Sequence, residues 1–128
     1  MNAPPAKSKA SARGITHTNF RTQSESAGFQ ILLADAAMKI ETAFLHAYRA
    51  ADDLDRYARE RSYPDLTARA LMRIDTAIVA KQCREAVDLL VSAHGTSSVA
   101  DASPMQRLWR DIHVASHHAI TEWQVNLE

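Results

Sequence analysis

The sequence lacks the features on which several specialised classes of protein depend. Cys83 is the only cysteine in 128 residues, which excludes an internal disulfide or a thiolate metal cluster and favours a cytoplasmic location. The 15 basic and 15 acidic residues give a net charge of +0, without the basic excess typical of proteins that bind nucleic acid or anionic membranes. Apolar runs are far shorter than the ~20 residues of a membrane span, and no secretory signal is evident.

Glycine is also scarce, and alanine is abundant. The chain has three glycines and is 46% hydrophobic, a composition that favours closely packed helices over sheet. Residues 1–14, MNAPPAKSKASARG, contain no acidic residue and predict a flexible leader. The remaining residues, 15–128, are expected to form one helical domain.

Three amphipathic segments follow the leader. Apolar residues recur three and four positions apart in each segment, and Pro64, Asp65 and Pro104 punctuate the pattern as helix ends and starts do. The second segment is apolar on more than one side, which is typical of the central helix of a bundle. The three predicted helices cover residues 24–62, 65–94 and 103–128.

These segments predict an all-α fold, an antiparallel up-down helical bundle. The second helix has a wider apolar surface than two neighbours can cover, and the amphipathic pattern still runs at 126–128 without a capping residue. We therefore expect an incomplete bundle that self-associates as a dimer or tetramer.

Segment 106–119, QRLWRDIHVASHHA, contains three histidines. At about 100° per residue, His113 and Trp109 lie beside the side that faces the bundle, whereas His118 and Asp111 lie on the opposite side. On that opposite side, His118 is either an exposed residue without a role or part of a second contact surface. The side predicted to face the bundle holds Met105, Leu108, Ile112, Ser116, Ala119 and Trp123.

A metal site is one alternative for this segment. His113 and His117 have the four-residue spacing with which two imidazoles share a zinc ion. No third ligand lies on the same side, and the HExxH pattern is absent from the sequence. We therefore interpret His113 as a half-buried residue at the edge of the bundle, and no metal site is predicted.

Two stretches carry a family likeness. Residues 85–119, EAVDLLVSAHGTSSVADASPMQRLWRDIHVASHHA, include the pattern Pro-x-Gln-Arg-x-x-Arg-Asp at 104–111 with His118 downstream. Together with FQILLADAAMKIETA at 29–43, they resemble the C-terminal helical domain of the acyl-CoA dehydrogenase superfamily. The likeness is greatest to its flavin-dependent monooxygenase branch, the oxygenase components of two-component aromatic hydroxylases.

The resemblance implies hydroxylation of an aromatic or polycyclic substrate with O2 and reduced FMN or FAD, which a flavin reductase partner supplies. It implies a catalytic role for His118 near the reactive edge of the flavin, where an imidazole suits proton transfer near neutral pH. It also implies that the loop 94–98 approaches the flavin phosphate. The cofactor-binding residues that the resemblance implies are Gly95, Thr96, Ser97, Arg110 and Asp111.

The sequence departs from this family in several ways. The loop has one glycine where the dehydrogenases have two, and no glutamate base of the dehydrogenase type is evident, which favours the monooxygenase branch. The family's N-terminal helical and β domains are missing, so tight flavin binding by this chain alone is not expected. Two alternatives stay open: a non-catalytic helical oligomerisation module, and a metal or haem bundle in which His46 or His94 converges with the other histidines.

Overall fold

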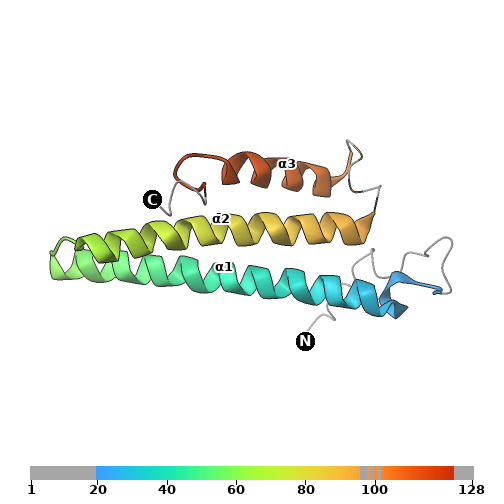
Figure 1. The fold of residues 1–128 in the computed structure, drawn as a ribbon, viewed down its shortest axis with the longest axis horizontal. Coiled ribbons are helices and arrows are strands. Elements are labelled where there is room, and N and C mark those ends of the chain that lie inside the picture. The colour runs from blue at the N-terminus through green and yellow to red at the C-terminus, as the bar shows by residue number, and fades with distance from the viewer. Residues whose placement is uncertain (1–19, 96–97, 99, 101, 123–128) are drawn as a thin grey trace, which may run out of the picture.

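The computed structural model describes residues 20–95, 98, 100 and 102–122, which contain only helices and turns. The all-α prediction is confirmed, and consecutive helices run antiparallel (Figure 1). The predicted leader at 1–14 lies outside the described residues. The elements in chain order are η1 (Gln23–Glu25), α1 (Ala27–Glu60), α2 (Leu66–His94) and α3 (Pro104–Ser116).

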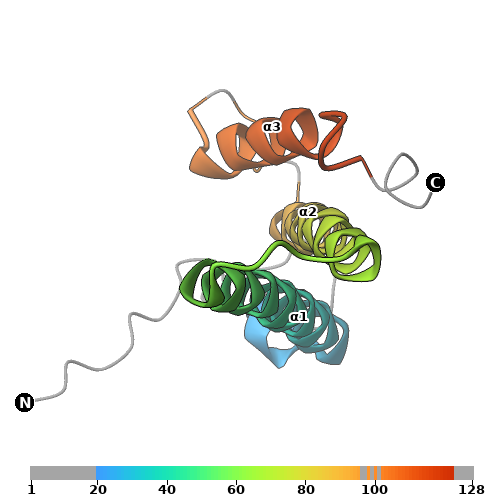
Figure 2. The ribbon, with the colours of Figure 1, turned by 90° about the vertical axis from the view of Figure 1, so that its left-hand side faces the viewer.

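The three helices form a single layer with α2 in the middle. The two views show α1 on one side of α2 and α3 on the other (Figures 1 and 2), and within the described part α1 packs only against η1 and α2. No residue of α2 from 74 to 91 is exposed. The prediction that the second helix is central is therefore confirmed, with a neighbour on each of its two apolar sides. The prediction that two neighbours cannot cover it is wrong for residues 74–91, and most exposed large apolar side chains lie on α1 and α3 instead.

The α1–α2 interface follows a seven-residue repeat. Phe29, Ala36 and Ala43 of α1 are buried, and Ala86 and Ala93 of α2 repeat the same spacing. A 3.5-residue period keeps one stripe of a helix against its partner over a long distance. Because most of these residues are alanines, the backbones approach closely, but little apolar area is buried.

The helix starts follow the sequence signals. The Ser26 hydroxyl accepts a hydrogen bond from the Phe29 amide at 3.4 Å, and the Asp65 carboxylate accepts one from Ala68 at 2.8 Å. These bonds satisfy amides that the first turn of a helix leaves without a partner. Pro104 occupies the first turn of α3, but the Ser103 side chain makes no capping hydrogen bond.

The end of α3 differs from the prediction. The helix stops at Ser116, and residues 117–121 form turns, whereas the sequence predicted a helix through residue 128. The Thr121 hydroxyl donates to the Ala115 carbonyl at 2.5 Å and to the His118 carbonyl at 3.0 Å. In a continuing helix the Ala115 carbonyl would accept from the amide of residue 119. Here it accepts from the His118 amide at 3.3 Å and from the Thr121 hydroxyl, and α3 ends. Residues 123–128 lie outside the described part.

Both outer helices of the layer, α1 and α3, expose apolar side chains. On α1, Ile31, Met38 and Leu45 lie seven residues apart and are 60–72% exposed. Leu108, which was predicted to face the bundle, is 56% exposed, because α2 is the only described helix against which α3 packs. Ala119 of the same predicted side is exposed beyond the end of α3, and Trp123 lies outside the described residues. None of the described helices is long and apolar enough to cross a bilayer.

Candidate functional site

Three charged residues of α3, here called its outer face, have exposed side chains. Arg107, Arg110 and Asp111 have side chains that are 59–79% exposed. The Asp111 carboxylate lies 3.8 Å from Arg107 Nε and 4.0 Å from Arg110 Nε. Such exposed ion pairs add little to stability. These groups are therefore open to a further partner.

His118 lies in the turn after α3 and is exposed. Its Nδ1 atom accepts a hydrogen bond from the Ile120 amide at 3.3 Å. Its carbonyl accepts bonds from the amides of Thr121 and Glu122, both at 2.8 Å. In the neutral ring the accepting Nδ1 leaves the proton on Nε2. The turn therefore fixes which nitrogen of His118 donates.

His113 lies at the edge of the α2–α3 interface, as the sequence indicated. Its Nε2 is 3.0 Å from Asp88 Oδ1, and Trp109 Nε1 donates to the same oxygen at 2.8 Å. The Trp109 and His113 ring centroids lie 4.4 Å apart. Sequence analysis missed Asp88. The one feature of the sequence that could have pointed to Asp88 is the presence of an aspartate inside the otherwise apolar run AVDLLV.

The histidines of this region do not share a ligand. His117 Nδ1 bonds the His113 carbonyl at 2.6 Å, and the two rings are 6.2 Å apart. Among the residues that the structure describes, no group of three or more histidine, cysteine, aspartate or glutamate side chains is arranged to hold a metal ion. His46 bonds Asp75 across the α1–α2 interface.

Two residues of the loop after α2, which was predicted to approach the flavin phosphate, bond back to the end of the helix. The Gly95 amide donates to the Val91 carbonyl at 3.1 Å. Ser98 is fully buried, and its hydroxyl donates to the carbonyls of Gly95 at 2.6 Å and Val91 at 3.3 Å. It closes the end of α2, because the last carbonyls of a helix lack partners within it. Gly95 is exposed, with φ 76° and ψ −165°, a conformation accessible essentially only to glycine. Thr96 and Ser97 lie outside the described residues.

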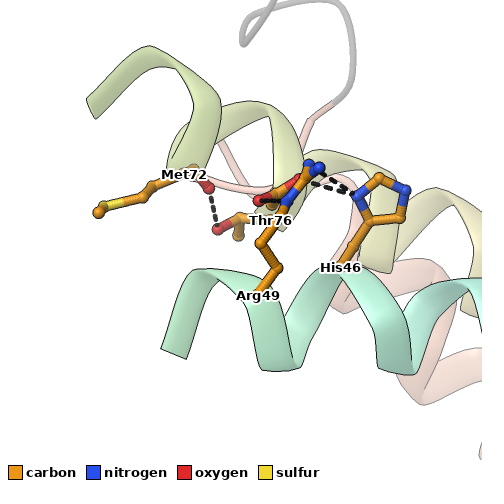
Figure 3. A network of polar contacts seen from close by, with 5 residues as sticks. His46, Arg49, Met72 and Thr76 are labelled. Carbon is orange, nitrogen blue, oxygen red and sulfur yellow. Dashed lines mark hydrogen bonds and ion pairs between the residues drawn. The ribbon is translucent and has the colours of Figure 1, made fainter. Parts of the chain in front are cut away.

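A second polar cluster joins α1 to α2 (Figure 3). Asp75 of α2 is 1% exposed. Its Oδ1 lies 2.8 Å from His46 Nδ1 and also accepts from Arg49 Nη2, and its Oδ2 accepts from Arg49 Nε at 3.0 Å. Burial alone raises the pKa of Asp75, but the bonds from Arg49 and His46 outweigh it and hold the pKa below its ordinary value. This cluster was not predicted from the sequence.

Surface grooves run on both sides of the α1–α2 pair. One of about 330 Å³ contains the Lys39–Glu85 ion pair, whose hydrogen bond lowers the pKa of Glu85. Another of about 380 Å³ lies beside Arg49. A third, of about 130 Å³, is apolar; Ile40, Ala43, Phe44, Ala47, Val79 and Cys83 line it. Burial raises the pKa of the Cys83 thiol, which makes it a weak nucleophile.

Comparisons with known proteins agree on one family. Residues 6–123 match the family described as acyl-CoA dehydrogenase, C-terminal domain. The p-hydroxyphenylacetate 3-hydroxylase oxygenase component of Acinetobacter baumannii is 32% identical over 93 residues, which are 73% of this chain and 22% of that protein. The structure of XiaF from Streptomyces sp. in complex with FADH2 and glycerol is 33% identical with a TM-score of 0.88, covering 93% of this chain and 30% of that chain. The chain thus spans less than a third of either relative.

Proposed function

The chain belongs to the acyl-CoA dehydrogenase C-terminal domain family, and we propose that it is the C-terminal helical bundle of a flavin-dependent monooxygenase. This membership was predicted from the sequence and is confirmed. The observation that carries the proposal is the likeness of the whole helical layer to XiaF, a protein that binds FADH2. The cytoplasmic location expected from the sequence stays a prediction.

The proposed reaction is the hydroxylation of an aromatic or polycyclic substrate. When bound, reduced FMN or FAD supplies the two electrons with which one oxygen atom of O2 enters the substrate and the other leaves as water. The A. baumannii relative, named as an aromatic hydroxylase, supports this substrate class. A flavin reductase is the partner that supplies the reduced flavin.

The outer face of α3 is the proposed wall of the flavin and substrate site. His118 is the proposed catalytic residue, because it is exposed and its donating nitrogen is fixed by the bond from Ile120. Arg110 suits the anionic part of the flavin, and the Asp111 carboxylate lies 4.0 Å from its Nε. In the loop after α2, the Gly95 amide already donates to the Val91 carbonyl and the Ser98 hydroxyl is occupied, so a phosphate there would have to displace the Gly95 bond.

This wall is not a complete pocket. The described residues offer surface grooves and an open helix face, and a ligand site normally surrounds most of its ligand. Other domains of the relatives, or a second copy of the chain, would supply the other walls. The exposed apolar side chains of α1 support self-association as a dimer or tetramer. They also suit the alternative, a non-catalytic oligomerisation module.

A chimera tests the proposal and separates it from that alternative. Residues 20–122 would replace the matching segment of the A. baumannii oxygenase. The assay, with reduced flavin and O2, measures product and hydrogen peroxide. We expect coupled hydroxylation by the chimera. A folded chimera that assembles but neither binds reduced flavin nor forms product would contradict the proposal and favour the oligomerisation module.

Flavin binding by the chain alone is the second measurement. Anaerobic titration with reduced and oxidised FMN and FAD should give no saturation at micromolar flavin, because only one wall is present. Micromolar affinity of the isolated chain would show that it carries a complete site.

A further inference from the structure

The apolar contact between α3 and α2 is thin. Ser116 is the one buried residue among those of α3. Met105 and Ile112 are half-buried, whereas Leu108 and Val114 are 56% and 72% exposed. Apolar burial is non-directional, so such a contact holds the helix against its neighbour without fixing its rotation. Something else must set the direction in which the outer face points.

The directional contacts come from two α2 side chains. Asp88 Oδ1 accepts hydrogen bonds from Trp109 Nε1 at 2.8 Å and from His113 Nε2 at 3.0 Å. These two donors lie one helical turn apart on α3. One turn earlier on α2, Arg84 Nη1 donates to the buried Ser116 hydroxyl at 3.5 Å. Because the Asp88 carboxylate only accepts, both rings must present an N–H to it.

These contacts define one position for α3. Moving α3 by a single residue would rotate its side chains by about 100° and shift them by about 1.5 Å along the axis, and neither ring would then reach Asp88. Hydrogen bonds weaken steeply when they bend or lengthen. The two donors to one oxygen therefore specify both the rotation and the height of the helix.

We propose that Asp88 is a positioning residue, which orients α3 and thereby aims Arg110, Asp111 and His118 at the reacting groups. Asp88 bonds Trp109 and His113 of α3 and none of these three residues in the contacts described above, so it acts through the helix. The effect on turnover rests on the proposed function. The effect on the orientation of α3 does not.

The orientation is measured on the full chain by NMR. Residual dipolar couplings of backbone amides report the direction of α3 relative to α2, and hydrogen exchange of the Trp109 indole reports its bond to Asp88. The Trp123→Phe variant assigns the two indole signals. Asp88→Leu should change the α3 couplings while leaving those of α1 and α2. It should also speed indole exchange roughly 10- to 100-fold, the range for a bond to a charged acceptor.

Two variants keep this test decisive. Asp88→Asn retains an accepting oxygen of the same shape, so it should retain the α3 couplings even if Asp88→Leu leaves α3 undocked. Asp35→Leu is the matched control, an exposed aspartate on α1, and should change neither signal. Unchanged α3 couplings in Asp88→Leu would overturn the proposal, as would an equal disturbance in Asp88→Asn.

Turnover is then compared in the chimeric oxygenase. Asp88→Leu should lower kcat for hydroxylation about tenfold, raise the share of peroxide and leave KM nearly unchanged. Asp88→Asn should restore most of the coupling. If α3 reorients while hydroxylation stays coupled, the positioning role stands, and the proposed function of the outer face of α3 is wrong.

Discussion

The two helix pairs of the layer are built differently. The α1–α2 pair joins helices of 34 and 29 residues through alanines in a seven-residue repeat, with Asp75 enclosed between them. In the α2–α3 pair, a helix of 13 residues buries a single serine and is oriented by polar bonds at its edge. Close packing fixes the long pair over the stretch that contains its buried residues, from Phe29 to Ala43 on α1 and from Asp75 to Ala93 on α2. The short pair leaves one face of α3 open.

The aspartates of the two interfaces differ in the same way as the interfaces themselves. Asp75 is buried, and both of its oxygens bond side chains of α1. Asp88 has a side chain that is 46% exposed and uses one oxygen for both donors. We infer that α1 and α2 form the scaffold and that α3 presents the chemistry. If this division is right, substitutions on the outer face of α3 and at His118 change turnover, and substitutions between α1 and α2 change stability.

The largest effect is expected at His118. In the chimeric oxygenase, His118→Ala should cut hydroxylation by about 10²–10⁴-fold, the usual contribution of an acid–base group, and increase uncoupled peroxide. The melting temperature should hardly change, because the side chain is exposed and its bond from the Ile120 amide lies at the surface. Unchanged coupling would remove His118 from the catalytic site. A large loss of stability would remove the contrast between the two pairs.

The scaffold is probed by Asp75→Ala. Removing one partner of a buried ion pair costs about 3–5 kcal/mol. The lower end is expected here, because the Arg49 side chain is 54% exposed and can be hydrated again. Urea unfolding followed by circular dichroism measures the change. As the control, Asp53→Ala removes an exposed pair with Arg56 and should change stability little. Equal losses in the two variants would contradict a structural role for the buried cluster.

A smaller effect is expected at His113. His113→Ala removes a bond to a carboxylate and a ring contact with Trp109, and should cost about 1–2 kcal/mol at this partly exposed site. The bonds from Trp109 to Asp88 and from Arg84 to Ser116 remain, so α3 keeps its orientation and oxygen use stays coupled to product. Unfolding and peroxide assays on the same variant measure both quantities. A peroxide burst like that of His118→Ala would place His113 in the chemistry.

The sequence predicted what depends on local signals. The helix starts at Asp65 and Pro104 follow from capping and proline geometry, and the central place of α2 follows from its two apolar sides. The end of α3 was not predictable, because Thr121 takes a carbonyl six residues earlier. Helical periodicity does not reveal a side-chain hydrogen bond that competes with the backbone bonds of the helix.

Contacts between helices could not be predicted from the sequence, for a different reason. Asp75 and Asp88 lie 26 and 25 residues from Arg49 and His113, and helical periodicity gives the face of a residue but not the register of its neighbour. The exposure of Leu108 has the same origin. Its side of α3 was predicted correctly as apolar, but which helix covers that side is not encoded in the spacing.

The smallest expected effect concerns pH, and it should again separate the two pairs. Asp75 and Glu85 have lowered pKa values, and both carboxyl groups pair with α1. A carboxyl group with a lower pKa in the folded state stabilises the fold at pH values above its unfolded pKa, and this contribution is lost as the pH falls through the folded value. Acid should therefore weaken the α1–α2 pair below about pH 4, close to the ordinary values of these groups. Urea unfolding across this range should give a smaller pH dependence for Asp75→Asn, since the amide does not titrate. The same slope in the variant and the parent chain would show that Asp75 contributes nothing to the acid sensitivity of the scaffold.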